Sequence, residues 1–186
     1  MTSRELFQLC SYRESARAAE KLFRRERIRI SRRLPGAIIE HCGATSVRRL
    51  ATKGDLDIVV RVLPEDFLTA ERALAGMYER NLGSDRSESF AAFLDERSRP
   101  QLGVQLVSIG SEHDDFDLLR DHLRVSPGCK RRFSLLKHRF AGRSTDRYRA
   151  AKGALIDFLR GREPLASLLA SRRSVAGATK TRRAGV

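Results

Sequence analysis

Several features that mark particular protein classes are scarce or missing in this chain. Its 186 residues include no tryptophan and only three cysteines, Cys10, Cys42 and Cys129. The cysteines are widely spaced, and neither a CxxC motif nor a histidine pair accompanies them. This spacing argues against a disulfide framework and against a structural zinc site. A reducing, cytoplasmic environment is therefore expected.

Long apolar runs are missing as well. No stretch approaches the ~20 apolar residues that span a bilayer, and the N-terminus lacks the apolar core of a signal peptide. The sequence therefore predicts a soluble protein that has no membrane partner. Its length suits one domain with a continuous core, and we place that domain at residues 1–168.

Positive charge, by contrast, is in excess. The chain has 37 lysines and arginines against 23 aspartates and glutamates, a formal net charge of +14. Such a surface attracts polyanions, so RNA or another polyanion is a candidate partner. Part of the excess lies in residues 169–186, a Ser/Ala/Gly/Thr-rich segment that we expect to be a disordered basic tail. Genome bias toward arginine is the alternative source of the charge.

The spacing of apolar residues predicts the order of helices and strands. Helices are expected at 4–29, after Pro64, and at 115–125, 127–140 and 145–160; strands are expected at 37–41, 56–63, 89–94 and 102–109. These elements predict an α+β fold in which helices flank a small mixed β-sheet. The first helix lies at the N-terminus, and the last three helices form a C-terminal helical cap.

Residues 43–53 have the composition of a phosphate-binding turn. Gly43 lets the backbone approach a phosphate closely, and the hydroxyls of Thr45 and Ser46 can donate to its oxygens. We expect a short helix from Ser46 to Thr52, N-capped by Thr45 or Ser46, whose first amides face the same phosphate. Lys53 adds positive charge. The alternative is an ordinary helix cap without a ligand.

Two carboxylates follow directly. Asp55 and Asp57 stand at positions i and i+2 at the start of a strand, and side chains at this spacing point to the same face of a sheet. Together they can bind one Mg²⁺ or bridge two, since hard divalent cations prefer oxygen ligands and keep phosphates in their shell. A solvated strand start is the alternative interpretation.

The order of these pieces resembles a known signature. A hydrophobic residue, a glycine, a small residue, about ten further residues and Asp-Leu-Asp-Ile resemble the DNA polymerase beta-like nucleotidyltransferase superfamily. More narrowly, EHCGATSV (40–47) with Leu50-Ala51 and Lys53 resembles the EHVGSTAV..LAAK block of the GrpB family. Three later segments agree in order with that family: RDHLR (120–124) with Pro127, Phe133 to Lys137, and Tyr148 with Lys152. The match covers roughly Ile38 to Phe158.

The resemblance implies a nucleotidyltransferase-like fold and a Mg²⁺-dependent reaction that moves a nucleoside monophosphate from a nucleoside triphosphate such as ATP to an acceptor. Asp55 and Asp57 would hold the metal and carry catalysis. The candidate nucleotide-binding residues are His41, Gly43, Ala44, Thr45, Ser46, Lys53, Arg120, Lys137 and Lys152. A satisfied, half-buried histidine is the alternative for His41, and ordinary salt-bridged positions are the alternative for Arg120, Lys137 and Lys152.

Three departures from the family pattern affect this interpretation. Many members carry an apolar residue where this chain has Asp55, and Arg48-Arg49 replaces the usual Pro-Gly. The superfamily's third carboxylate belongs on a later strand, but the expected strand 102–109 offers Gln105 and Ser108. Four acidic residues, Glu88, Asp95, Glu96 and Glu112, are candidates to reach the site from a strand end or loop, but none has the expected setting. A noncatalytic nucleotide- or RNA-binding module is therefore the alternative function, and a partner domain for a coenzyme-A-pathway enzyme is a third. The sequence does not identify the acceptor, the preferred base or the oligomeric state.

Overall fold

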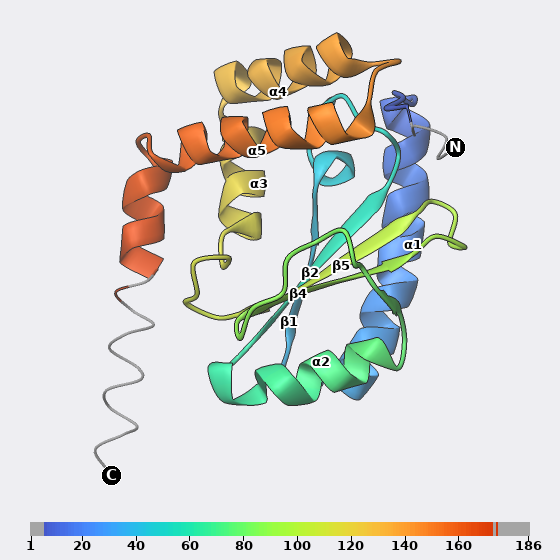
Figure 1. Ribbon diagram of the computed structural model, residues 1–186, viewed down its shortest axis with the longest axis vertical. Coiled ribbons are helices and arrows are strands. Elements are labelled where there is room, and N and C mark those ends of the chain that lie inside the picture. Colours follow the sequence, from blue (N-terminus) through green and yellow to red (C-terminus); the bar gives the residue numbers. More distant parts are fainter. Residues whose placement is uncertain (1–5, 173, 175–186) are drawn as a thin grey trace.

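A computed structural model describes residues 6–172 and residue 174, which fold around one five-stranded mixed sheet (Figure 1). The strand order is β1-β2-β5-β4-β3. The strands are β1 (Ile38–Cys42), β2 (Leu56–Val62), β3 (Glu79–Arg80), β4 (Phe90–Asp95) and β5 (Leu102–Ser108). β2 and β5 run parallel, and the other neighbouring pairs are antiparallel. The expected α+β class with a mixed sheet is confirmed.

One face of the sheet packs against α1 (Tyr12–Arg33) and α2 (Phe67–Ala75), which follows the 3₁₀ turn η2 (Pro64–Asp66). Because strand side chains alternate between faces, every second residue of β2 and β5 enters this core. The contributing strand residues are Leu56, Ile58, Val60, Val62, Leu102, Val104 and Leu106. Burying such a side chain stabilises the fold by about 1.5–3 kcal/mol, so this face forms the main core.

The helical cap lies on the other side and consists of α3 (Phe116–Val125), α4 (Pro127–Phe140) and α5 (Thr145–Arg160). α4 and α5 lie side by side across one end of the sheet (Figure 1). Ser126 and Ser144 accept hydrogen bonds from the backbone N–H groups of Cys129 and Arg147, and these N-caps set the starts of α4 and α5. The ranges predicted for these two helices are confirmed.

Two predicted helix boundaries differ from the structure. The N-terminal helix begins at Tyr12 rather than near residue 4, since Leu6 and Cys10 form β-bridges with Ser144 and Thr52. The helix after Pro64 ends at Ala75, and the two-residue strand β3 follows where its continuation was expected. Long-range backbone pairing thus replaces the first turns of the predicted N-terminal helix and the last turns of the helix after Pro64.

The helix expected from Ser46 to Thr52 is wrong. The structure has a three-residue 3₁₀ turn, η1 (Ala44–Ser46), followed by turns in which Arg49 adopts a positive φ of 60°. Val47 and Leu50 are both buried against the helical cap. The chain must then return to the β-bridge at Thr52, and this path leaves no room for regular helix.

After α5, residues 165–172 are helical again (Figure 1). Leu169 is buried in the cap cluster, the apolar cluster that also contains Val47, Leu50, Leu123, Phe133, Leu159 and Leu165. Arg172 pairs with Asp117 at 2.6 Å. The rest of the basic tail expected from residue 169 lies outside the described residues, apart from residue 174. Within the described ranges, none of the helices combines the length and apolar character that crossing a bilayer requires.

Candidate functional site

Asp57 lies between two glycines at the start of β2, where it pairs with Cys42 of β1 and Gly103 of β5. A Cβ atom added at Gly43 would lie 2.0 Å from Asp57 Oδ2, and one at Gly103 would lie 3.3 Å from Asp57 Oδ1. Gly43 also has a φ of 70°, a conformation that favours glycine. Gly43 was expected to admit a phosphate; in this structure it leaves room for the Asp57 carboxylate.

Gly43→Ala is therefore expected to displace Asp57 and to strain the turn. We expect the protein to lose about 1–3 kcal/mol of stability, measured by urea unfolding. Gly153→Ala in α5 is the matched control, because nothing lies within 4 Å of its added Cβ and alanine favours a helix by about 0.5–1 kcal/mol. Equal stability of the two variants would contradict this account of Gly43.

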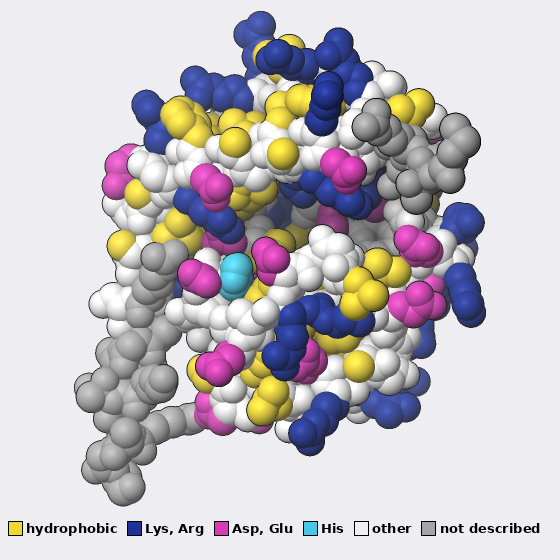
Figure 2. Space-filling model, viewed as in Figure 1, with side chains coloured by type: hydrophobic (Ala, Val, Ile, Leu, Met, Phe, Trp, Pro, Cys, Tyr) yellow, Lys and Arg dark blue, Asp and Glu magenta, His cyan; other side chains and the backbone are white. Residues whose placement is uncertain are grey.

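Three lysines surround the two aspartates. Lys53 Nζ lies 3.1 Å from Asp55 Oδ2, Lys137 comes from α4, and Lys152 comes from α5. The charges of both aspartates act on Lys137, and all three lysines act on Asp57. The structure thus brings together five of the predicted residues. Figure 2 shows a hollow between the cap and the sheet that Lys/Arg and Asp/Glu side chains line.

The protonation equilibria in this cluster are strongly shifted. Burial raises the pKa of Asp57, the charge of Asp55 raises it further, and the lysines oppose both effects. Burial lowers the pKa of Lys137 to about 8, and the charge of Lys152 acts in the same direction. Burial also lowers the pKa of Lys53, but Asp55 and Asp57 outweigh it, so the pKa rises. Lys137 is therefore the lysine that can exchange a proton near neutral pH.

The donor atoms present suit a hard divalent cation. The Gln105 amide lies near the Asp57 carboxylate, since a Cβ added at Gly103 would be 3.2 Å from Gln105 Nε2 and 3.3 Å from Asp57 Oδ1. The Gln105 Oε1 atom is buried and has no hydrogen-bond partner, and amide oxygens are acceptable ligands for such ions. Over the described ranges no group of three or more His, Cys, Asp or Glu side chains is placed to hold a metal. Two carboxylates and one orphan amide oxygen fit Mg²⁺ in the donors they offer.

The turn residues after Gly43 bond to the backbone. The Thr45 hydroxyl donates to the Asp55 carbonyl at 3.0 Å, and the Ser46 hydroxyl donates to the Gly43 carbonyl at 2.7 Å. Ala44 packs against the cap cluster. The N-cap role expected for Thr45 or Ser46 is wrong, because no α-helix follows. The Thr45 hydroxyl instead ties the turn to the residue before β2, and the Ser46 hydroxyl closes the turn on itself.

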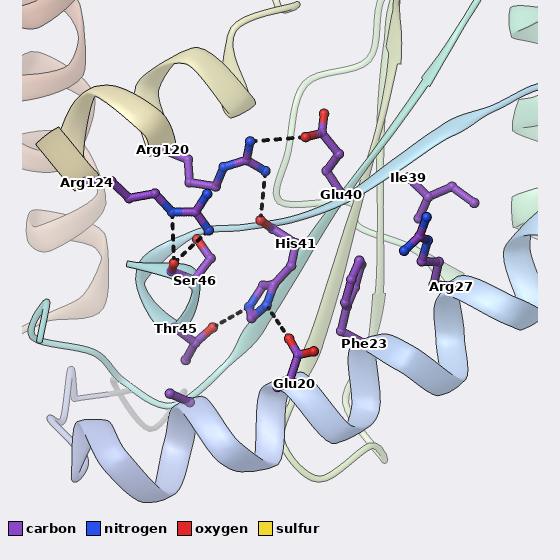
Figure 3. A pocket seen from close by; sticks show the side chains of 11 residues that line it. Glu20, Phe23, Arg27, Ile39, Glu40, His41, Thr45, Ser46, Arg120 and Arg124 are labelled. Atoms are coloured by element: carbon purple, nitrogen blue, oxygen red, sulfur yellow. Dashed lines mark hydrogen bonds and ion pairs between the residues drawn. The ribbon is translucent and has the colours of Figure 1, made fainter. Parts of the chain in front are cut away.

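His41 is not brought to the lysine cluster. Its neighbour Cys42 pairs with Asp57 in the sheet, so His41 points to the opposite face. There it lines a polar cavity of about 440 Å³ between α1, β1 and α3 (Figure 3). Its Nε2 lies 3.0 Å from Thr45 Oγ1 and its Nδ1 lies 3.6 Å from Glu20 Oε2. Burial lowers the pKa of His41, and the charge of Glu20 opposes this effect.

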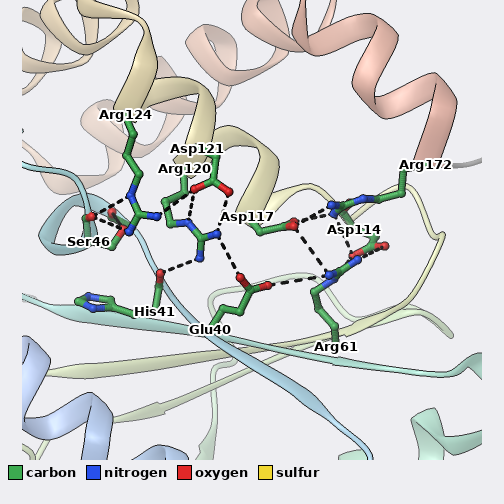
Figure 4. Close-up of polar contacts among 11 residues, drawn as sticks. Glu40, His41, Ser46, Arg61, Asp114, Asp117, Arg120, Asp121, Arg124 and Arg172 are labelled. Atoms are coloured by element: carbon green, nitrogen blue, oxygen red, sulfur yellow. Dashed lines mark hydrogen bonds and ion pairs between the residues drawn. The ribbon is translucent and has the colours of Figure 1, made fainter.

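Arg120 joins α3 to the edge of the sheet. It donates to the His41 carbonyl at 3.2 Å, to Glu40 Oε1 at 3.1 Å and to the Asp121 carboxylate (Figure 4). These contacts support the salt-bridged alternative for Arg120 rather than a nucleotide contact. Tyr148, the aromatic residue of the last motif, likewise packs within the protein, with its ring 3.9 Å from that of Phe7.

A buried ion-pair network was missed in the sequence. Arg61 of β2 makes a bidentate pair with Asp114, and its Nη1 lies 3.7 Å from Asp117 and 3.9 Å from Glu40 (Figure 4). Arg172 pairs with Asp117 from the other side. Glu40 belongs to the EHCGATSV motif, and its place there was the sequence signal that could have pointed to the network. The other partners are far apart in the chain and carry no motif.

Comparison with known proteins identifies the family of this chain. The model of the GrpB protein family matches residues 12–162. The chain belongs to the GrpB family. Among curated relatives, it is 32% identical over 144 residues to a UPF0157 protein of Vibrio cholerae, which covers 77% of each chain. It is 29% identical over 136 residues to a UPF0157 protein of Deinococcus radiodurans, which covers 72% of this chain and 71% of the relative.

Two solved structures resemble this GrpB chain at low sequence identity. The crystal structure of GrpB from Enterococcus faecalis aligns with a TM-score of 0.49 and 16% identity, covering 86% of this chain and 92% of that one. The MgGTP-bound Cid1 poly(U) polymerase aligns with a TM-score of 0.46 and 15% identity, covering 67% of this chain and 42% of the polymerase. Likeness at this level does not bear on activity.

Proposed function

We propose that this GrpB chain is a Mg²⁺-dependent nucleotidyltransferase that moves a nucleoside monophosphate from a nucleoside triphosphate, ATP among the candidates, to an acceptor. The observation that supports the proposal is the meeting of Asp55, Asp57 and Lys53 with Lys137 and Lys152 of the helical cap. Carboxylates that hold a cation beside ammonium groups are suited to a metal-bound polyphosphate.

Each group has a role in this proposal. Asp55, Asp57 and the Gln105 amide oxygen would hold Mg²⁺, which when bound neutralises charge on the phosphates. Lys137 and Lys152 would donate hydrogen bonds to phosphate oxygens from the cap side, and Lys53 would do so from the loop before β2. Because these groups come from separate elements, the nucleotide would lie between the sheet and the cap.

The bond changes follow from this placement. An acceptor hydroxyl oxygen forms a bond to the α-phosphorus while the bond from that phosphorus to pyrophosphate breaks. Pyrophosphate leaves with the electron pair, and the hydroxyl proton passes to water. Lys137, whose pKa lies at about 8, holds a proton that stabilises the departing pyrophosphate. Positioning and charge stabilisation account for most of the catalysis in phosphoryl transfer.

The direct test uses four α-labelled nucleoside triphosphates with Mg²⁺ and pooled acceptors: small metabolites, RNA and protein. Label should appear in at least one acceptor class, and calorimetry should show binding of Mg-ATP or of another Mg-nucleotide. No transferred label together with no nucleotide binding would overturn the proposal. Binding without transfer would favour the noncatalytic module, an alternative that the Gln105 amide in place of a third acid supports.

Lys137 should also make nucleotide binding depend on pH. Its pKa is lowered to about 8, so the side chain is cationic below that pH and neutral above it. We expect affinity for Mg-ATP to fall as pH rises through 8, by up to about tenfold at pH 9. In Lys137→Met, affinity should be about tenfold lower at pH 7 and nearly flat from pH 7 to pH 9.

Calorimetry at three pH values checks this expectation, and Lys130→Met on the same helix is the control. Lys130→Met should keep both the affinity and the slope of the wild type. A pH profile of Lys137→Met that matches the wild type would remove Lys137 from the site.

A further inference from the structure

The outer face of the helical cap has the composition of a docking surface. Residues 126–163 contain 11 lysines and arginines but 3 aspartates and glutamates. Figure 2 shows Lys/Arg side chains standing out from the top of the molecule, over α4 and α5, with hydrophobic side chains between them. Six exposed arginines of this region form no ion pair with another described residue: Arg131, Arg132, Arg139, Arg143, Arg147 and Arg162.

Helical spacing places part of this set on one surface. Arg132, Leu135 and Arg139 stand at i, i+3 and i+7 of α4, and Arg147 and Phe158 stand at i and i+11 of α5. Both spacings return to the same side of a helix. Residues 147 and 158 are about 16 Å apart at 1.5 Å per residue. The result is an elongated surface across the helix pair, with arginines along it.

An exposed aromatic ring lies at one end of this surface. Phe158 is 44% exposed, and the guanidinium groups of Arg132 and Arg162 lie 5.6 Å and 5.1 Å from its ring centroid. An aromatic ring flanked by arginines can stack with a nucleobase while the arginines contact phosphates. Apart from Phe158, Leu135 is the large apolar side chain on this face, and two such side chains are few for insertion into a lipid surface.

The other basic helix differs in two ways. α1 contains 9 lysines and arginines and 3 glutamates, but Arg24 pairs with Glu20, and Arg25 and Arg29 pair with the buried Glu26. It also packs on the face of the sheet opposite Asp57. Neither total charge nor unpaired basic residues single out the cap, because six of the nine basic residues of α1 also form no ion pair with a described residue. The exposed Phe158 ring beside the arginines of the cap does.

We propose that the outer face of α4 and α5, formed by Arg132, Arg139, Arg147 and Phe158, binds single-stranded nucleic acid. The surface is separate from the Asp57 site, so this inference and the proposed transfer reaction succeed or fail independently. Arginines hold the phosphates, and Phe158 stacks with a base without selecting its identity. Affinity should then fall steeply with salt.

The test measures fluorescence anisotropy of a labelled, unstructured 20-nucleotide RNA with the full chain at 50–200 mM KCl. The triple variant Arg132→Gln/Arg139→Gln/Arg147→Gln should bind at least about 30-fold more weakly, with a log–log salt slope smaller by about 2. Phe158→Ala should lose about tenfold without a change in slope. The matched control removes three exposed arginines from α1, Arg17→Gln/Arg32→Gln/Arg33→Gln, and should lose less than about threefold.

Several outcomes would overturn the proposal. These are no RNA binding by the wild type at 50 mM KCl, equal losses in the two triple variants, or unchanged binding in the cap variant. Vesicles of phosphatidylglycerol and phosphatidylcholine provide a further arm: cap-dependent binding to vesicles but not to RNA would identify a lipid surface instead. Thermal unfolding confirms that each variant is folded, and Mg-ATP calorimetry shows that the Asp57 site is unaffected.

Discussion

Asp57→Asn is expected to lower nucleotide transfer by about three orders of magnitude or more. The substitution keeps the shape of a side chain that lies between Gly43 and Gly103 but removes the negative charge proposed to hold Mg²⁺. Charge stabilisation by a metal amounts to several kcal/mol, and each 1.36 kcal/mol corresponds to a tenfold change in rate. Initial rates with the α-labelled nucleotide that the wild type prefers measure the effect.

The same variant should not lose stability. The pKa of Asp57 is raised in the folded protein by burial and by Asp55, so the folded state binds its proton more tightly than the unfolded state does. The ionised side chain therefore weakens the fold at neutral pH, and this cost develops as pH rises through the folded pKa. Asparagine removes the charge, so the unfolding midpoint should stay level or rise. Asp66→Asn, on the exposed turn before α2, is the control and should change neither quantity.

A folded Asp57→Asn protein with wild-type activity would show that the carboxylate has no role in transfer. An Asp57→Asn protein that unfolds would contradict the view that Asp57 is maintained at a cost to stability.

Asp114→Ala is expected to give the largest loss of stability, about 3–5 kcal/mol, because it leaves a buried cation without its partner. The Asp114 side chain is 1% exposed, pairs with Arg61, and accepts a hydrogen bond from the Gly110 backbone at 2.9 Å. Arg172 also approaches it, at 3.7 Å. For a protein of this size the thermal midpoint should fall by about 6–20 °C.

Urea and thermal unfolding provide the measurement, and Asp157→Ala is the control. Asp157 also pairs with an arginine, Arg160, but its side chain is 72% exposed, so its loss should cost less than about 1 kcal/mol. If the two variants had equal stability, the network around Arg61 would not anchor α3 to the sheet.

The parts of the fold that local sequence determines were predicted well. α4 and α5 begin at Ser-Pro and Ser-Thr steps whose serines cap them, and β2 is an apolar run that leaves the turn after Gly54. The helix expected between Ser46 and Thr52 failed because long-range contacts decide that segment: Val47 and Leu50 are buried under the cap, and Thr52 pairs with Cys10. No local propensity records these partners.

The site was predictable to a similar extent and for similar reasons. Motif order pointed to Asp55, Asp57, Lys53, Lys137 and Lys152, which the structure groups together. The face of the sheet to which His41 points depends on the register between β1 and β2, because a shift of one residue would move its side chain to the opposite face. The Arg61–Asp114 pair joins residues 53 positions apart, so only the folded topology reveals it.

The edges of the sheet limit how this protein can associate with others. Edge strands offer unpaired backbone groups to which another chain can add a strand, and natural proteins shorten or cover them. β3 is two residues long, and at the opposite edge Arg120 occupies the His41 carbonyl of β1. Arg120 thus removes one acceptor from the β1 edge, and the short β3 offers few backbone groups at the other, so both edges are less open to an added strand.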